Sequence, residues 1–151
     1  MNFMKEALKE AYEGIENGHG GPFGSVVVKG DKIVGRGHNR VLSKKDPTCH
    51  GEIEAIRNAC KNLDTFDLSG CEIYTTAEPC PMCLGAILWA NIKTVYYGCN
   101  RIDTDSIGFR DDIFYEYLSG KTSLIELKET DRTECLALFE DFKNKEDRGM
   151  Y

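Results

Sequence analysis

The sequence predicts one α/β domain, in which a β-sheet is covered by helices. Segments rich in β-branched and aromatic residues alternate with segments of helical periodicity along the 151 residues. The first two strand-like segments are joined by a hairpin turn, and neither repeats nor low-complexity linkers interrupt the chain. Strands that are separated by helices are expected to pair in parallel.

Local patterns place one helix, a polar break and a hairpin in the first third of the chain. The helix has apolar residues at helical spacing, and it ends where a glycine- and proline-rich stretch begins. The two strands are joined by Gly30-Asp31, a turn signal. The expected segments are a helix over 2–17, strands over 25–29 and 32–37, and a polar loop over 39–48.

The rest of the chain alternates between helices and strands. The helical segment over 52–63 carries apolar residues on one face, and the one over 81–90 is largely apolar. The strand segment over 72–76 is rich in residues that favour β-structure. The expected elements are helices over 52–63, 81–90 and 111–118, strands over 72–76, 93–98 and 124–127, and a closing helix over 131–145.

Composition and charge narrow the function classes. The net charge is −6, whereas proteins that bind nucleic acids usually present a basic face, so a small neutral or cationic substrate is favoured over a nucleic acid. The chain lacks an apolar run long enough to span a membrane, and its first residues do not resemble a secretion signal. We therefore expect a cytoplasmic protein without a membrane partner.

Two short motifs open two of the expected helices. His50-Gly51-Glu52 precedes the helix over 52–63, and Pro79-Cys80-Pro81-Met82-Cys83 begins the helix over 81–90. Both follow strand-to-helix loops, which meet at the carboxyl edge of an open sheet, where ligands bind. The two motifs are therefore expected to form one site.

The cysteine spacing favours a metal. Cys80 and Cys83 lie three positions apart, on one face of a first helical turn, where the helix dipole favours thiolates. Two thiolates with His50 make a three-ligand zinc site, and a catalytic zinc keeps its fourth position for water. Glu52 is close to this site without being a ligand.

Other interpretations of the motif are weaker. A structural zinc needs a fourth ligand from His19, His38 or Cys49, none of which has paired ligand spacing. A thioredoxin-like redox pair leaves His50 and Glu52 unexplained. The combination is instead similar to the His-x-Glu…Pro-Cys-x-x-Cys signature of zinc deaminases that act on nucleobases.

Charge balance assigns Glu52 a role in that chemistry. Two thiolates cancel the +2 charge of zinc, so a water at the metal is acidified less than at an all-histidine site. A carboxylate must then help to remove the water proton. We expect Glu52 to take this proton, pass it to a ring nitrogen and later protonate the departing amine.

Further stretches extend the resemblance over almost the whole chain. The sequence resembles the cytidine deaminase superfamily, and within it the small bacterial guanine deaminases. The stretches concerned are Gly20-Gly21-Pro22-Phe23-Gly24, Asp46-Pro47-Thr48, Ala55-Ile56-Arg57, Glu78 to Ile87, and Trp89-Ala90. The resemblance implies a three-layer α/β/α sandwich around a five-stranded mixed sheet, whose first strand pair is antiparallel.

The resemblance also implies an activity. Guanine and water would give xanthine and ammonia, with one Zn²⁺ per subunit as cofactor. Cytosine deaminase and tRNA wobble-adenosine deaminase remain alternatives, and a non-catalytic zinc scaffold is an alternative of another class. Gly51 stands where alanine is more usual, and Arg110 stands where an acidic or neutral residue is expected, so the choice of base is less specified than the reaction.

Five residues are implied as substrate contacts: Asn39, Phe23, Gly51, Asp111 and Tyr151. Asn39 offers an amide to a purine edge or makes only a local turn, and Phe23 stacks on the base or packs in the core. The Gly51 amide would bind a substrate oxygen. Asp111 either accepts hydrogen bonds from the donor groups of guanine or caps a helix.

The resemblance implies a homodimer in which C-terminal segments are exchanged between subunits. Tyr151 would then reach the pocket of the partner, or it belongs to an unanchored tail.

Overall fold

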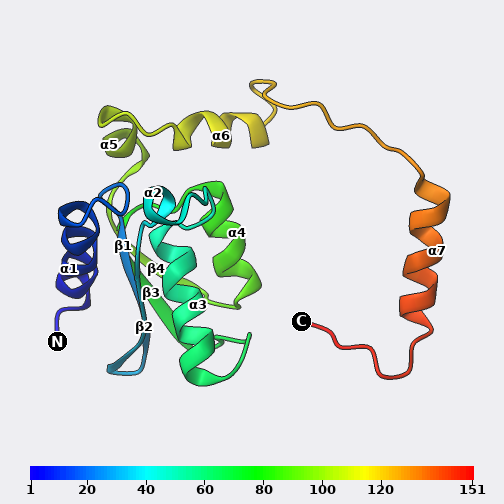
Figure 1. Ribbon diagram of the computed structural model, residues 1–151, viewed down its shortest axis with the longest axis horizontal. Helices are drawn as coiled ribbons and strands as arrows, with labels where there is room; N and C mark the ends of the chain where they lie inside the picture. Colours follow the sequence, from blue (N-terminus) through cyan, green and yellow to red (C-terminus); the bar gives the residue numbers. More distant parts are fainter.

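The computed structural model describes residues 1–151 and places a central sheet between helices (Figure 1). Each predicted helix forms within two residues of its expected bounds. The elements in order are α1 (Phe3–Glu16), β1 (Gly24–Lys29), β2 (Lys32–His38), α2 (Val41–Lys44), α3 (Gly51–Leu63), β3 (Cys71–Ala77), α4 (Pro81–Trp89), β4 (Thr94–Cys99), α5 (Arg101–Ser106), α6 (Asp111–Leu118) and α7 (Arg132–Lys143).

The sheet is mixed and has the strand order β2-β1-β3-β4. β1 is antiparallel to β2 and also to β3, whereas β3 and β4 are parallel. The antiparallel first pair and the parallel pairing across α4 confirm two expectations. The carboxyl ends of β2, β3 and β4 consequently lie at the same edge of the sheet.

Alternation along β1 divides the core into two layers. Val26 and Val28 pack with Ala7 of α1 on one face, and Val27 packs with Ala55 of α3 on the other. Figure 1 shows α1 on one side of the sheet and α3 and α4 on the opposite side. The predicted three-layer arrangement is therefore correct.

The predicted fifth strand is wrong. The sheet has four strands, and residues 124–127 form no strand, although three of these four residues are apolar. A strand needs a hydrogen-bonded neighbour, and this segment leaves the domain after α6 (Figure 1). The helix expected over 131–145 forms as α7, but it stands apart from the domain and does not close it.

Two short helices were missed. α2 lies inside the segment that was expected to be a polar loop, and α5 follows β4 directly. The start of α5 carries a recognisable signal, because the Asn100 side chain accepts from the Asp103 amide and the Asp103 carboxylate accepts from the Asn100 amide. None of the helices combines the length and the apolar character that crossing a membrane requires.

Two glycines of β2 allow α3 to pack closely against the sheet. A Cβ atom on Gly35 would overlap the backbone oxygen of Ala55, and one on Gly37 would overlap the Ala55 nitrogen. This close approach fixes the position of α3, whose first turn carries Glu52. The glycines of the hairpin therefore help to place the site at the sheet edge.

We predict that Gly37→Ala destabilises the fold by about 1–3 kcal/mol, because α3 must move away from β2. Gly85→Ala is the matched control, since a Cβ there meets no atom within 4 Å. In the middle of α4 that change is neutral or stabilises by up to about 1 kcal/mol. Urea unfolding of both variants measures the difference, and equal midpoints would contradict the close packing.

Candidate metal and substrate site

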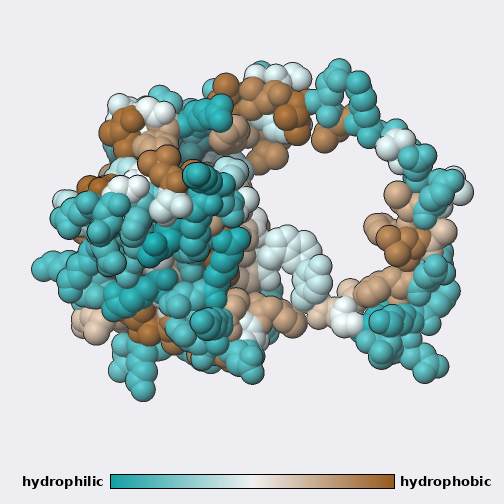
Figure 2. Space-filling view, in the orientation of Figure 1, coloured by the Kyte–Doolittle hydropathy of each residue, from teal (hydrophilic) through white to brown (hydrophobic).

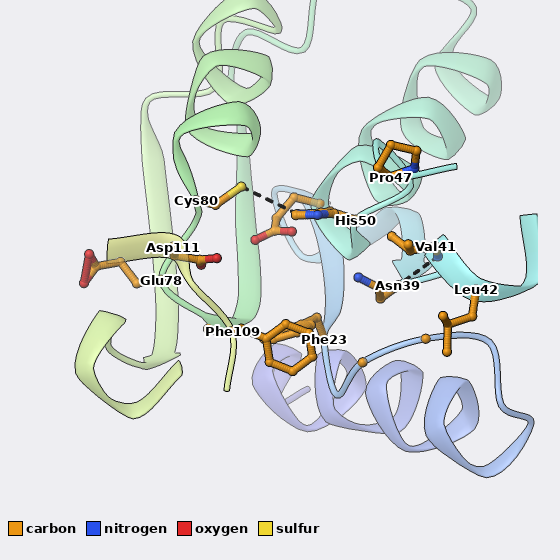
Figure 3. Close-up of a pocket in the computed structure, with 14 residues that line it drawn as sticks. Phe23, Asn39, Val41, Leu42, Pro47, His50, Glu78, Cys80, Phe109 and Asp111 are labelled. Carbon is orange, nitrogen blue, oxygen red and sulfur yellow. Dashed lines mark hydrogen bonds between the residues drawn. The ribbon is translucent and has the colours of Figure 1, made fainter. Parts of the chain in front are cut away.

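The main candidate site is a cavity of about 420 Å³ at the carboxyl edge of the sheet (Figure 3). Its walls come from the loop before β1, the end of β2, the starts of α3, α4 and α6, and the end of β3. The lining residues are Gly20, Gly21, Phe23, Asn39, Val41, Leu42, Pro47, His50, Glu52, Ala77, Glu78, Cys80, Phe109 and Asp111. The two sequence motifs therefore meet, as predicted.

The three predicted metal ligands converge at this cavity. One donor atom each from His50, Cys80 and Cys83 lies within 4.8 Å of the others. The His50 Nδ1 atom is 3.5 Å from both Sγ atoms. In a tetrahedral site with Zn–S of about 2.3 Å and Zn–N of about 2.0 Å, the nitrogen and sulfur atoms are also about 3.5 Å apart. The residues therefore fit a zinc ion.

Both ligand segments stand at helix N-termini. His50 is the N-cap of α3, and Cys80 is the N-cap of α4, with Pro81 at the first helical position. Neither N-cap side chain hydrogen-bonds its own helix, so the imidazole and the thiol are free to bind a metal ion. Cys83 is fully buried beneath them and does not line the cavity.

The three donor groups shift one another's pKa values in the metal-free protein. A hydrogen bond from the Cys83 thiol, with further help from His50, lowers the pKa of Cys80 to about 4. The pKa of Cys83 is raised, because its thiol bonds the Cys80 sulfur and is buried. The hydrogen bond to Cys80 raises the pKa of His50. Zinc binding must therefore displace a proton from Cys83.

Glu52 lies beside the donor set in the first turn of α3. Its side chain is buried yet lines the cavity, and its Oε1 atom accepts a hydrogen bond of 3.4 Å from the Thr75 hydroxyl. Ser25 in turn donates to Thr75 at 2.9 Å. Burial raises the pKa of Glu52, which suits a group that takes up and returns a proton.

Asn39 lies at the end of β2 and is buried in the cavity wall. Its Oδ1 atom accepts from the Val41 amide at 3.0 Å, so the side chain makes the local turn that was one of the two interpretations. The turn uses only the oxygen, and the Nδ2 group points into the cavity (Figure 3). Gly20 must lack a side chain, because a Cβ atom there would overlap Oδ1.

Two aromatic rings form one wall of the cavity (Figure 3). Phe23 packs edge-to-face against Phe109, with ring centroids 4.9 Å apart and an interplanar angle of 83°. Phe109 was missed by the sequence analysis, because only its proximity to Asp111 in the sequence pointed to it. Half-exposed rings of this kind offer an apolar surface to a planar base.

Asp111 begins α6 and directs its carboxylate into the cavity (Figure 3). It does not cap its helix: the N-cap is Arg110, which makes no side-chain capping bond. Burial, followed by the nearby Cys80, raises the pKa of Asp111. The Arg110 guanidinium instead lies 5.4 Å from the centre of the Phe114 ring.

Two of the expected substrate contacts do not line the cavity. Gly51 is buried at the first position of α3, where a Cβ atom would lie 3.0 Å from the Phe23 carbonyl oxygen. Tyr151 is 82% exposed and lies near Phe66 and Trp89, at the far end of the domain. Within one chain, Tyr151 therefore does not reach the pocket.

The other histidines form a separate network. His19 Nδ1 lies 2.8 Å from His38 Nε2, and His38 Nδ1 lies 3.0 Å from the Glu10 carboxylate. Cys49, the remaining alternative ligand, accepts instead from Arg57 at 3.5 Å. The described metal cluster thus contains His50, Cys80 and Cys83 alone. A three-ligand site beside a buried glutamate, at the edge of a helix-covered sheet, defines the class of zinc-dependent deaminases.

The comparisons with known proteins agree with this class. Residues 1–99 match the cytidine and deoxycytidylate deaminase zinc-binding region, and the chain belongs to this family. It is 41% identical to the guanine deaminase of Bacillus subtilis over 99% of this chain and 97% of that protein.

A crystal structure of guanine deaminase from Bacillus subtilis has a TM-score of 0.94 to this chain at 41% identity, covering 100% of this chain and 99% of the other. A tRNA-specific adenosine deaminase of Buchnera aphidicola is 38% identical over 95% of this chain and 93% of that protein. Zinc is therefore the metal that the site and the family both indicate.

We predict that zinc binding to the metal-free protein releases protons. Zinc requires two thiolates and a neutral imidazole, so Cys83 must lose its proton, and His50 must lose a second at pH values below its raised pKa. The apparent affinity then rises with pH, by about tenfold per unit for each proton released. Calorimetric titration in buffers of different ionisation enthalpy counts these protons, and a pH-independent affinity would contradict the assignment.

Proposed function

We propose that this protein deaminates guanine by hydrolysis, giving xanthine and ammonia. The observation that carries the proposal is the Asp111 carboxylate, which faces the cavity that also contains the metal ligands. A carboxylate accepts hydrogen bonds, and guanine presents a ring N–H and an amino group as donors. The corresponding ring nitrogens of adenine and cytosine are acceptors, which an ionised carboxylate does not bind.

The remaining lining groups complement a purine. The Asn39 Nδ2 group donates to a ring acceptor on the edge away from Asp111. Phe23 and Phe109 cover a face of the base, and aromatic–base stacking contributes roughly 1–3 kcal/mol in nucleic-acid systems. These contacts orient the amino-bearing carbon toward Glu52 and the metal ligands.

Zinc, held by His50, Cys80 and Cys83, supplies Lewis acidity that makes a water easier to deprotonate. Glu52 accepts a proton from the attacking water, and the new C–O bond forms at the amino-bearing carbon. Glu52 then gives that proton to the adjacent ring nitrogen and carries the next one to the amino group. The C–N bond breaks, and ammonia leaves. The Thr75 hydroxyl keeps the carboxylate of Glu52 in place throughout.

The similarity to a tRNA-specific adenosine deaminase favours a second candidate substrate. The net charge of −6 and the Asp111 carboxylate at the cavity argue against a polyanion. The cytosine alternative is disfavoured by the same carboxylate. Seven free cysteines, two of them metal ligands, suit the reducing cytoplasm, where we place the protein.

We also infer that the active form is a homodimer with exchanged C-terminal segments. Every residue from 123 to 151 is exposed, and α7 stands apart from the domain (Figure 1). The side of α7 that faces the domain across an open gap is apolar (Figure 2). The exposed apolar residues of this segment are Leu124, Ile125, Leu127, Leu136, Leu138, Phe139, Phe142, Met150 and Tyr151. Such a surface needs a partner, and a second copy of the domain supplies one.

We predict that the zinc-loaded protein releases ammonia from guanine and not from adenine, cytosine, their nucleosides or tRNA. Glu52→Gln keeps zinc but lowers kcat by at least about 100-fold, because the amide cannot carry the proton. Asp111→Asn, the comparison variant, keeps Glu52 and mainly weakens guanine binding. Ammonia from cytosine or tRNA alone, or near-normal turnover by Glu52→Gln, would refute the proposal.

Exchange of the C-terminal segments predicts complementation between two inactive chains. One chain carries Glu52→Gln with an intact tail, and the other lacks Tyr151 but keeps Glu52. When the two are unfolded and refolded together, mixed dimers contain one pocket with Glu52 and a Tyr151 from the other chain. Activity should return to roughly a quarter of the wild-type value for random mixing. Two outcomes would contradict exchange: no recovery, or full activity of the chain that lacks Tyr151.

A further inference from the structure

A group of side chains behind the cavity connects α6 to the loop that carries the metal ligands. The loop contributes Glu78 and Pro79, immediately before Cys80. α5 contributes Arg101 as its first residue, and α6 contributes Tyr115. These four residues lie together along a surface cavity on the outer side of the loop. The sequence motifs include Glu78 and Pro79, whereas Arg101 and Tyr115 were not singled out by the sequence analysis.

The contacts within this group are specific. The Tyr115 hydroxyl donates a hydrogen bond to the Pro79 carbonyl oxygen. The Arg101 Nε atom lies 3.1 Å from the Glu78 carboxylate, and its guanidinium carbon lies 4.3 Å from the centre of the Tyr115 ring. A further Arg101 nitrogen is 3.7 Å from the Asp112 carboxylate. Arg101 thus contacts both the ligand loop and α6.

The position of α6 depends on few other contacts. Its main neighbours are α5 and α4, and it does not lie in either of the buried core clusters. Figure 1 shows α6 at the edge of the domain, where the chain leaves toward α7. Asp111 is the first residue of this helix, and the Tyr115 ring lies one turn further along it. A shift of the helix therefore moves the Asp111 carboxylate.

We propose that Arg101 and Tyr115 are positioning residues, which hold Asp111 at a fixed place relative to the metal ligands and thereby set the selectivity for guanine. This proposal rests on the proposed function, in which the Asp111 carboxylate accepts hydrogen bonds from guanine. Arg101 is suited to this role: its planar guanidinium pairs with a carboxylate at its edge while its face covers an aromatic ring. A lysine at this position would keep the positive charge but would lack the planar group that covers the aromatic ring.

The mobility of α6 tests the positioning without any substrate. Tyr115→Phe keeps the ring under Arg101 and removes only the hydroxyl that bonds Pro79. Tyr117→Phe, the matched control, removes a phenol hydroxyl from the same helix that takes no part in these contacts. Hydrogen exchange of the α6 amides should be faster by roughly five- to tenfold in Tyr115→Phe and in Arg101→Gln. Exchange equal to that of Tyr117→Phe would overturn the positioning role.

Steady-state kinetics test whether Arg101 and Tyr115 influence guanine binding by way of Asp111. With zinc content unchanged, Tyr115→Phe and Arg101→Gln should raise KM for guanine by roughly five- to tenfold and change kcat much less. Arg101→Lys, which keeps the charge, should recover part of the loss. The same two substitutions should have almost no further effect in an Asp111→Asn background, because coupled residues are not additive.

The outcomes separate this inference from the proposed function. The inference would fail if Tyr115→Phe and Arg101→Gln changed KM equally in the presence and absence of the Asp111 carboxylate. It would also fail if Tyr115→Phe lost zinc. Either result would mean that the contacts only support the fold or the ligand loop. If the wild-type protein released no ammonia from guanine, the proposed function would fail first, whatever the hydrogen exchange of α6.

Discussion

The convergence of two helix N-termini at the carboxyl edge of the sheet is the constraint on which the rest of the site depends. His50 is the N-cap of α3 and Cys80 is the N-cap of α4, and neither side chain hydrogen-bonds its own helix. The Nδ1 atom of His50 lies 3.5 Å from each sulfur only because β2 and β3 bring both helices to one edge. The glycines of β2 remove the side chains that would hold α3 further out.

The donor set then determines what the neighbouring residues must do. Two thiolates neutralise a divalent ion, so the proton transfers fall to a carboxylate, and Glu52 is the buried carboxylate in reach. The metal ligands and Glu52 therefore determine the reaction, whereas Asn39, Asp111 and the two phenylalanine rings determine which base binds. Those residues come from the segments that surround the ligand helices, and one of these segments, α6, has no buried residue.

Sequence patterns predicted the parts of the structure that depend on local chemistry. The ligand spacing in Cys80 and Cys83 is local, as is the capping position of His50, and the structure has all three donors together. The strand expected over 124–127 failed because pairing depends on a neighbour that one chain does not provide there. Phe109 and the group around Arg101 could not be foreseen, because their contacts join segments whose relative placement only the fold determines.

The central claim is that His50, Cys80 and Cys83 form an open three-ligand zinc site. Zinc-edge X-ray absorption of the loaded protein tests it most directly. The claim predicts two sulfur atoms at about 2.3 Å, one imidazole nitrogen at about 2.0 Å and one light atom that a substrate analogue can replace. A third sulfur or a second imidazole in the coordination shell would mean a closed structural site and would contradict the account.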